Sequence, residues 1–290
     1  MTEVRDALPL PEVAAMKRAG TKIVMVTAYD HPSARLASEA GVDLILVGDS
    51  AGNNVLGYES TVPVTMNEAV MLTSAVARAK PRALIVGDMP FGSFQASDAD
   101  AVANAIRLVK AGADAVKLEG AGPMTSRVRA IVGAGIPVMG HLGLTPQSAT
   151  MLGGMKAQGQ TAAGASHLLA DARELEEAGC FSLVLESVPA RIGALISEAL
   201  TMPTIGIGAG GGCDGQVLVW HDLLGINEGV APRFVKRYAN LAGETRRALE
   251  AFAAEVRSGA YPADEHVYKI GGDELRAFEA ELNNGDSPTD

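Results

Sequence analysis

Short apolar runs recur along the chain, and each is followed by a polar or charged residue and then by a stretch with helical spacing. Runs this short could be turns of buried helices, but their length, their Val and Ile content and the neighbouring Gly and Pro residues favour β-strands. We therefore expect strands at residues 22–27, 43–48, 83–87, 114–118, 136–140, 181–185, 203–208 and 216–220.

The segments between these strands carry helix signals. Residues 97–111 read SDADAVANAIRLVKA, so Ser97 or Asp98 can cap the first turn, which is acidic, and Gly112 ends the segment. Helices are also expected at residues 11–18, 67–79, 162–178, 189–200 and 244–259.

A strand followed by a helix is thus repeated about eight times. Right-handed crossovers between parallel strands close naturally into a (β/α)8 barrel, or TIM barrel, of that size. We predict one barrel domain over residues 1–268, with the helix at 11–18 capping the bottom of the barrel and the helix at 244–259 as its last helix. Residues 269–290 form an acidic tail whose end we expect to be disordered.

Two connections, at residues 49–66 and 141–161, are longer than the roughly 12–15 residues usual for a loop in a compact domain. Both begin at the C-terminal end of a predicted strand, where barrels of this type build their active sites. We interpret them as lids or substrate-binding loops.

Titratable residues stand at the C-terminal ends of five predicted strands. They are Asp49, Asp88, Glu119, His141 and Glu186. In a parallel barrel they converge on one face, and four carboxylates in one cleft repel one another unless a cation binds or some are protonated. Oxygen ligands of this kind suit Mg²⁺. A single strand-end Asp is more often a turn former, but recurrence on four strands favours a cation site.

Three further features allow more than one interpretation. Lys117 and Glu119 point to the same side of their strand, so Lys117 could bind an anionic substrate, form a Schiff base or make a structural ion pair. His141 could be a ligand, an acid–base group or a buried histidine satisfied by hydrogen bonds. The glycine-rich run 206–212 could bind phosphate or form a ligand-free turn, and no basic residue accompanies it.

The chain carries 24 Lys and Arg against 34 Asp and Glu, a formal charge of −10. Such a surface repels nucleic acid and anionic membranes, so we expect neither as a partner, and solubility is the plainest explanation of the acidity. No apolar run approaches a membrane span, and the opening MTEVRD shows no targeting signal. Cys180 and Cys213 lack metal-ligand spacing, which favours free thiols in the cytoplasm.

Longer motifs together resemble one known family. They are VTAYD at 26–30, VGDSAGNNVLGYESTVPVT at 47–65, GDMPF at 87–91, KLEG at 117–120, GHLGLTPQS at 140–148, LVLESVP at 183–189, GIGAGGGCDGQVLVWHDLLG at 206–225 and YPADEHVY at 261–268. Over residues 22–268 the chain resembles the ketopantoate hydroxymethyltransferase family, whose fold is similar to the phosphoenolpyruvate mutase/isocitrate lyase barrels. Ala51, Asn53, Met155 and Gln160 depart from the usual pattern, all within the two long loops.

The resemblance implies transfer of a hydroxymethyl group from the co-substrate 5,10-methylenetetrahydrofolate to 3-methyl-2-oxobutanoate, giving 2-dehydropantoate in the first step of pantothenate biosynthesis. It also implies a homo-oligomer, a decamer. On this basis we expect Mg²⁺ to be held, directly or through water, by Asp49, Asp88 and Glu119. The keto acid is expected to bind to Asp49, Ser50, Asp88 and Lys117, to which we add His141. Glu186 is the expected catalytic base.

Such chemistry needs a cation that stabilises the enolate formed when the C–H bond beside the keto group breaks. The sequence leaves two alternatives open. One is a carbon–carbon or carbon–phosphorus lyase of the mutase/isocitrate lyase type, which typically uses a cysteine in a mobile loop. The other is a non-catalytic barrel that serves as a binding module. In such a module the clustered carboxylates would lower the stability of the fold without serving a function.

Overall fold

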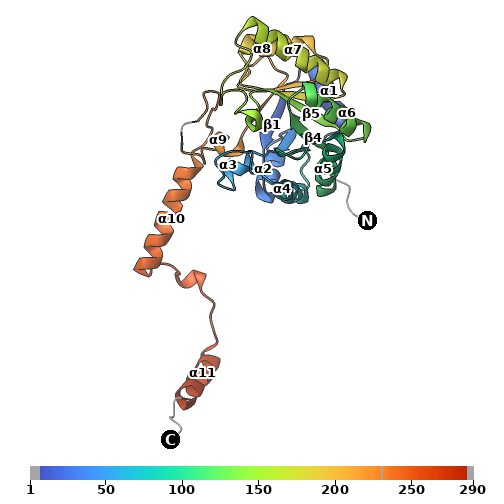
Figure 1. Ribbon diagram of the computed structural model, residues 1–290. Helices are drawn as coiled ribbons and strands as arrows, with labels where there is room; N and C mark the ends of the chain where they lie inside the picture. Colours follow the sequence, from blue (N-terminus) through green and yellow to red (C-terminus); the bar gives the residue numbers. More distant parts are fainter. Residues whose placement is uncertain (1–6, 230, 286–290) are drawn as a thin grey trace. The chain divides into compact units, whose positions relative to one another are not determined.

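The computed structural model describes residues 7–229 and 231–285. Within these residues, eight parallel strands pair in chain order and close into a barrel, because the last strand pairs with the first (Figure 1). The strands are β1 (Ile23–Thr27), β2 (Leu44–Val47), β3 (Leu84–Asp88), β4 (Ala115–Glu119), β5 (Val138–Gly143), β6 (Ser182–Glu186), β7 (Thr204–Ile207) and β8 (Gly215–Leu218). The predicted (β/α)8 barrel is confirmed.

Helices surround the barrel and connect its strands (Figure 1). The longer ones are α2 (His31–Glu39), α4 (Met66–Arg78), α5 (Asp98–Ala111), α6 (Thr125–Gly133), α7 (Ala162–Glu177) and α8 (Ala190–Ala199), and the shorter ones are α3 (Ala51–Asn54), η1 (Gly122–Met124), η2 (Pro146–Ser148) and α9 (Trp220–Leu223). Their ends follow the sequence signals: the Ser97 side chain caps α5 by accepting from the Asp100 N–H, and Gly112 ends α5 in the left-handed conformation.

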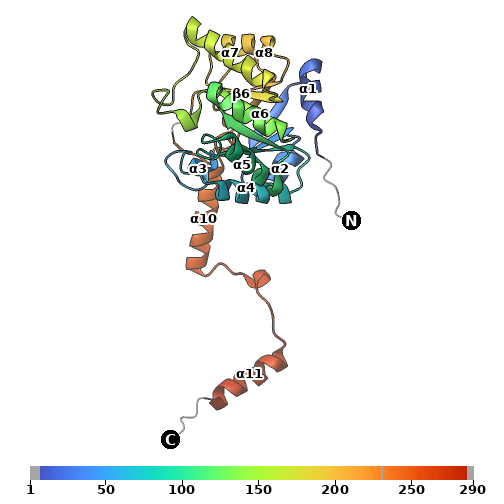
Figure 2. The same ribbon diagram turned by 45° about the vertical axis from the view of Figure 1, so that its right-hand side comes forward.

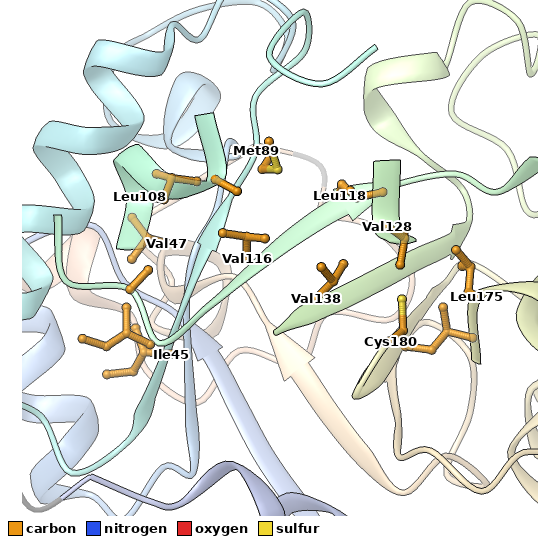
Figure 3. Close-up of a cluster of buried hydrophobic side chains, with 14 of the residues drawn as sticks. Ile45, Val47, Met89, Leu108, Val116, Leu118, Val128, Val138, Leu175 and Cys180 are labelled. Carbon is orange, nitrogen blue, oxygen red and sulfur yellow. The ribbon is translucent and has the colours of Figure 1, made fainter. Parts of the chain in front are cut away.

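Successive side chains along each strand point to opposite faces of the sheet, and this produces two apolar layers. Side chains such as Met25, Leu46 and Val86 fill the inside of the barrel. The intervening side chains point outward and pack against the helices. Figure 3 shows part of this outer layer, in which Val116 and Leu118 of β4 lie close to side chains from the helices, among them Leu108, Val128 and Leu175. Because both faces of β2 to β7 are covered, these strand sequences are mostly apolar, whereas β1 and β8 each leave one side chain exposed, Val24 and Gln216.

Helix α1 (Leu10–Ala19) closes the end of the barrel at which the strands begin. Its Val13 is fully buried in the same cluster as Ile23 at the start of β1. Lys17 donates from Nζ to the carbonyls of Ser197 and Met202, at 2.8 and 3.0 Å, and lies 3.0 Å from an Asp214 carboxylate oxygen. Figure 2 shows α1 on the side of the barrel away from the segment between β5 and α7, drawn in yellow-green. The predicted capping helix is confirmed.

The chain divides into two compact units, residues 1–239 and residues 240–290. The second unit contains α10 (Leu241–Ser258), η3 (Asp264–His266) and α11 (Gly272–Gly285). From the sequence we expect the 244–259 helix to be the last helix of the barrel and the domain to run to residue 268. In the structure α10 belongs to the second compact unit, and both its place as the last barrel helix and the domain boundary at residue 268 stay predictions. Residues 286–290, where disorder is expected, lie outside the described residues.

No helix among the described residues has the length and apolarity to cross a membrane.

Replacing Leu108 with Ala tests the outer apolar layer. Leu108 is fully buried between α5 and the barrel, so we expect the substitution to lower the free energy of unfolding by about 2–5 kcal/mol, through lost burial and the cavity left behind. Ile106→Ala on the same helix is the control, because Ile106 is partly exposed and its loss should cost much less. Urea titration of both variants measures the difference, and equal losses would contradict the packing described.

Candidate active site

A polar layer lies above the apolar interior of the barrel, at the C-terminal ends of the strands. The alternation that turns Val86, Ala115, Met139 and Val184 inward also turns inward the residue two positions later on the same strand. Those residues are Asp88 on β3, Lys117 on β4, His141 on β5 and Glu186 on β6, with Glu119 two further along β4. Parallel pairing sets Asp88 beside Lys117 and Glu119 beside His141. The strand geometry alone therefore gathers these charged groups.

A cavity of about 280 Å³ opens at this layer. Its lining includes every residue selected from the sequence: Asp49, Ser50, Asp88, Lys117, Glu119, His141 and Glu186. The rest of the wall is mainly apolar and includes Met155 from the long 141–161 connection, Ile207 at the end of β7 and Phe234. The glycine run 206–212 contributes only that one residue, Ile207, to the lining.

Lys117 is the buried cation of the cavity. Its Nζ lies 2.8 Å from Asp88 Oδ1, and both side chains are almost fully buried. Burial lowers the pKa of Lys117, but the carboxylates of Asp88, Glu119 and Asp49 outweigh burial and hold the pKa above its ordinary value. Lys117 therefore stays an ammonium ion at neutral pH. This favours ion pairing over Schiff-base formation, which needs the neutral amine.

His141 links two carboxylates. Its Nδ1 lies 3.4 Å from Glu119 Oε1, and its Nε2 lies 3.1 Å from Glu186 Oε2. Burial and Lys117 lower the pKa of His141, but the neighbouring Glu119 and Glu186 outweigh both and raise it to about 9. The protonated imidazole therefore places positive charge between these two carboxylates, while Lys117 Nζ lies 3.4 Å from its Nδ1.

The pKa values of both cavity aspartates are raised in this arrangement. Burial, and then the charge of Asp88, raise the pKa of Asp49 to about 8. Burial also raises the pKa of Asp88, although Lys117 opposes the effect. For Glu119, burial again acts to raise the pKa, but His141, the charge of Lys117 and a backbone N–H donor together outweigh burial and lower the pKa. A carboxyl group with a pKa of about 8 is mostly protonated at neutral pH, so the side of the cavity formed by Asp49 and Asp88 holds more acidic groups than its neighbours keep ionised, and added positive charge would ionise Asp49.

This imbalance bears on metal binding. Among residues 7–229 and 231–285, no three His, Cys, Asp or Glu side chains are already arranged as metal ligands. One reason is that Lys117 contacts Asp88 and Gln147 contacts Asp49, so both carboxylates are held by internal partners. The donor set nevertheless fits a hard cation, because it consists of carboxylate oxygens whose raised pKa values reflect confined negative charge.

Two residues of this region were not selected from the sequence. Gln147 donates to Asp49 and Glu119, and its signals in the sequence were its place in the long 141–161 connection and in the GHLGLTPQS motif. Tyr29 lies 2.8 Å from Ser50, oxygen to oxygen, and burial raises the pKa of its phenol to about 12, so it stays neutral. Tyr29 thereby fixes the Ser50 hydroxyl at the edge of the cavity.

Gly143 lets β5 pass close to Glu186. Its φ is +92°, and a Cβ at this position would lie 2.2 Å from the Glu186 carbonyl oxygen. The next residue, Leu144, donates its N–H to the same carbonyl at 2.8 Å. Only glycine satisfies both the conformation and the close approach, so Gly143 fixes the backbone that carries the Glu186 carboxylate.

The cysteines lie outside the cavity lining. Cys180 precedes β6, at the structural end of the barrel, and burial raises the pKa of its thiol to about 12. Cys213 is fully buried, and burial raises its pKa as well. Both are free thiols. Neither is placed to act as the loop cysteine of the lyase alternative.

The barrel is similar in fold to the phosphoenolpyruvate mutase/isocitrate lyase barrels. A solved structure of 2,3-dimethylmalate lyase, a member of that superfamily, superposes with a TM-score of 0.59 at 16% identity, covering 99% of each chain. Phosphonopyruvate hydrolase in complex with oxalate and Mg²⁺ gives 0.58 at 15% identity, covering 94% of this chain and 99% of that one. At such identity the likeness shows the fold alone and does not favour a lyase.

Sequence comparison is more specific. The sequence model of the family described as ketopantoate hydroxymethyltransferase matches residues 8–264. A 3-methyl-2-oxobutanoate hydroxymethyltransferase of Moorella thermoacetica is 59% identical over 266 residues, which are 91% of this chain and 99% of the relative. One from Thermotoga neapolitana is 56% identical over 85% of this chain and 92% of the relative. The chain belongs to the ketopantoate hydroxymethyltransferase family, as its motifs indicated.

Gly143→Ala tests the close approach beside Glu186. Any L-residue with positive φ costs roughly 1–2 kcal/mol, and here the new methyl group also overlaps the Glu186 carbonyl. Gly135→Ala is the matched control, because Gly135 has φ +84° but a methyl group there would meet nothing within 4 Å. We expect Gly143→Ala to lower the melting temperature clearly more than Gly135→Ala in calorimetry. Equal shifts would show that the overlap is relieved without cost.

Proposed function

We propose that this enzyme transfers a hydroxymethyl group from 5,10-methylenetetrahydrofolate to 3-methyl-2-oxobutanoate, giving 2-dehydropantoate and tetrahydrofolate. This is the first step of pantothenate biosynthesis. Family membership and the names of its relatives support the proposal. The structural observation that carries it is the gathering of Asp49, Asp88, Glu119 and Lys117 in one buried cavity, where an oxoacid and a divalent cation can meet.

Asp49, Asp88 and Glu119 would hold Mg²⁺, directly or through water. When bound, the ion supplies positive charge that favours formation of the oxoacid enolate. The placement of all three carboxylates in the lining of one cavity supports this assignment.

Lys117 and Ser50 would bind the keto acid. The Lys117 ammonium is permanently charged in this environment and can pair with the substrate carboxylate. The Ser50 hydroxyl, held by Tyr29, can donate to a substrate oxygen. Apolar side chains of the wall, such as Val184 and Ile207, would receive the branched carbon chain and exclude water around it.

Glu186 would act as the base. It lies on a different strand from the three proposed metal residues, it lines the cavity, and one of its oxygens lies 3.1 Å from His141 Nε2. Glu186 would accept the proton from the carbon beside the keto group, and the electron pair of that C–H bond would then form the new bond to the one-carbon unit. Over the whole reaction one water is consumed, and its oxygen becomes the new hydroxyl.

The decameric assembly and the cytoplasmic location stay predictions. Analytical ultracentrifugation of the purified protein tests the first, and fractionation of the source cells tests the second.

Replacing Glu186 with Gln should remove the base while keeping its shape. We expect exchange of deuterium from D₂O into 3-methyl-2-oxobutanoate, measured by NMR with Mg²⁺ and without folate, to slow at least about 100-fold. Binding of Mg²⁺ and the keto acid should persist in calorimetric titration. Glu198→Gln on α8, an exposed site outside the cavity, is the control and should exchange at the wild-type rate. Wild-type exchange in Glu186→Gln would rule Glu186 out as the base.

Removing a proposed metal ligand should uncouple keto-acid binding from Mg²⁺. We expect Asp49→Asn and Asp88→Asn to bind 3-methyl-2-oxobutanoate with little or no enhancement by Mg²⁺, because each loses a charged oxygen ligand. Asp98→Asn, which changes an aspartate paired with Arg127 away from the cavity, should keep the wild-type enhancement. Calorimetry with and without Mg²⁺ measures it. Full enhancement in both cavity variants would contradict the proposed ligand set.

A further inference from the structure

Gln147 is a buried polar residue that the proposed reaction does not use. It lies in η2, near the start of the long connection between β5 and α7, and only 6% of it is exposed. Burying an amide is favourable only if its donors and acceptors find partners, so its hydrogen bonds indicate what it is for.

Those hydrogen bonds reach two of the proposed metal residues. The Gln147 backbone N–H donates to Glu119 Oε2 at 3.0 Å. The side-chain Nε2 donates to Asp49 Oδ2 at 2.9 Å and to the Met89 carbonyl at 3.0 Å. Gln147 therefore ties a carboxylate that follows β2 to a carboxylate at the end of β4, and it uses the backbone just after β3 as a third anchor.

A second glutamine fixes which way the Gln147 amide points. Gln95 Oε1 accepts the backbone N–H of Gly92 at 2.7 Å, so the Gln95 NH₂ group must face the other way. That group donates to Gln147 Oε1 at 3.3 Å. Gln147 is left with its own NH₂ group facing Asp49. Each amide thus has one orientation, because Gly92 donates to Gln95, Gln95 donates to Gln147, and Gln147 donates to Asp49.

The same connection is also anchored beside the proposed base. Leu144 donates its N–H to the Glu186 carbonyl, and Gln158 donates its N–H to the Ser187 carbonyl at 2.9 Å. The residues between these anchors include Met155, which lines the cavity. One segment therefore contacts both the metal side and the base side of the site.

We propose that Gln147, oriented by Gln95, is a positioning residue for the cation site: it holds the Asp49 and Glu119 carboxylates where both can serve one divalent ion. This rests on the proposed function, in which these residues bind Mg²⁺. A carboxylate freed from its donor would turn about its own bonds and would have to be ordered again each time the ion binds. Partners that orient metal ligands typically contribute about 10–100-fold in metal affinity.

Gln147→Met tests this. Met is of similar length and tolerates burial but lacks the donor to Asp49, while the backbone N–H to Glu119 is kept. We expect the affinity for Mg²⁺, titrated by calorimetry in saturating 3-methyl-2-oxobutanoate without folate, to fall about 10–100-fold. Gln95→Met keeps the Gln147 donor but not its orientation and should weaken Mg²⁺ binding less, in the same direction.

Gln158→Met is the matched control. Its side chain donates only to the Lys156 carbonyl at an exposed position on the same connection, so Mg²⁺ affinity should stay at the wild-type value. Wild-type affinity in Gln147→Met, even with a lower melting temperature, would overturn the proposal and leave Gln147 a purely structural role. If Gln147→Met does not fold, wild-type affinity in Gln95→Met overturns it. Absence of Mg²⁺ binding in the unaltered enzyme would instead overturn the proposed function on which it rests.

Discussion

The contact between Lys117 and Asp88 is the interaction on which the rest of the site depends. Parallel pairing of β3 and β4 forces these two side chains together inside the barrel, where little water screens them. One ammonium ion cannot neutralise every carboxylate nearby, so the remaining acids need other partners. His141 serves Glu119 and Glu186, and Gln147 serves Asp49. The site is therefore a set of negative charges whose neutralisation is incomplete, and this makes it receptive to a cation.

Much of the fold followed from sequence because the strand signals are local. Each run of Val, Ile and Leu must be buried on both faces, and this requires the helices between the runs to cover the sheet. The surface that covers α10 could not be obtained in this way. Its apolar residues, such as Leu249, Phe252 and Val256, have the spacing of a helix with one apolar face, and the helix belongs to the second unit. Amphipathic spacing shows that a helix needs an apolar partner but does not say which surface provides it.

The site residues that stand at strand ends could be predicted from the sequence, because the strand ends converge in a barrel. Asp88, Lys117 and Glu186 could be selected because a strand end fixes where a side chain points. Gln147 and Tyr29 could not, since their contacts depend on the path of a connection and on packing between distant segments. The protonation of His141 was also beyond sequence reasoning, because it depends on the balance between burial, a nearby ammonium and two carboxylates.

The closed ring has a further consequence. The charged residues proposed to bind and react come from the region between the end of β2 and the end of β6, so the middle of this arc is β4. The seam where β8 meets β1 lies on the far side of the ring and lines the same cavity with Thr27 and Val217. The first and last strands of the barrel therefore shape the space for a ligand without supplying the charged groups proposed to act on it. Substitutions at the seam can alter which ligand fits while those charged groups keep their positions.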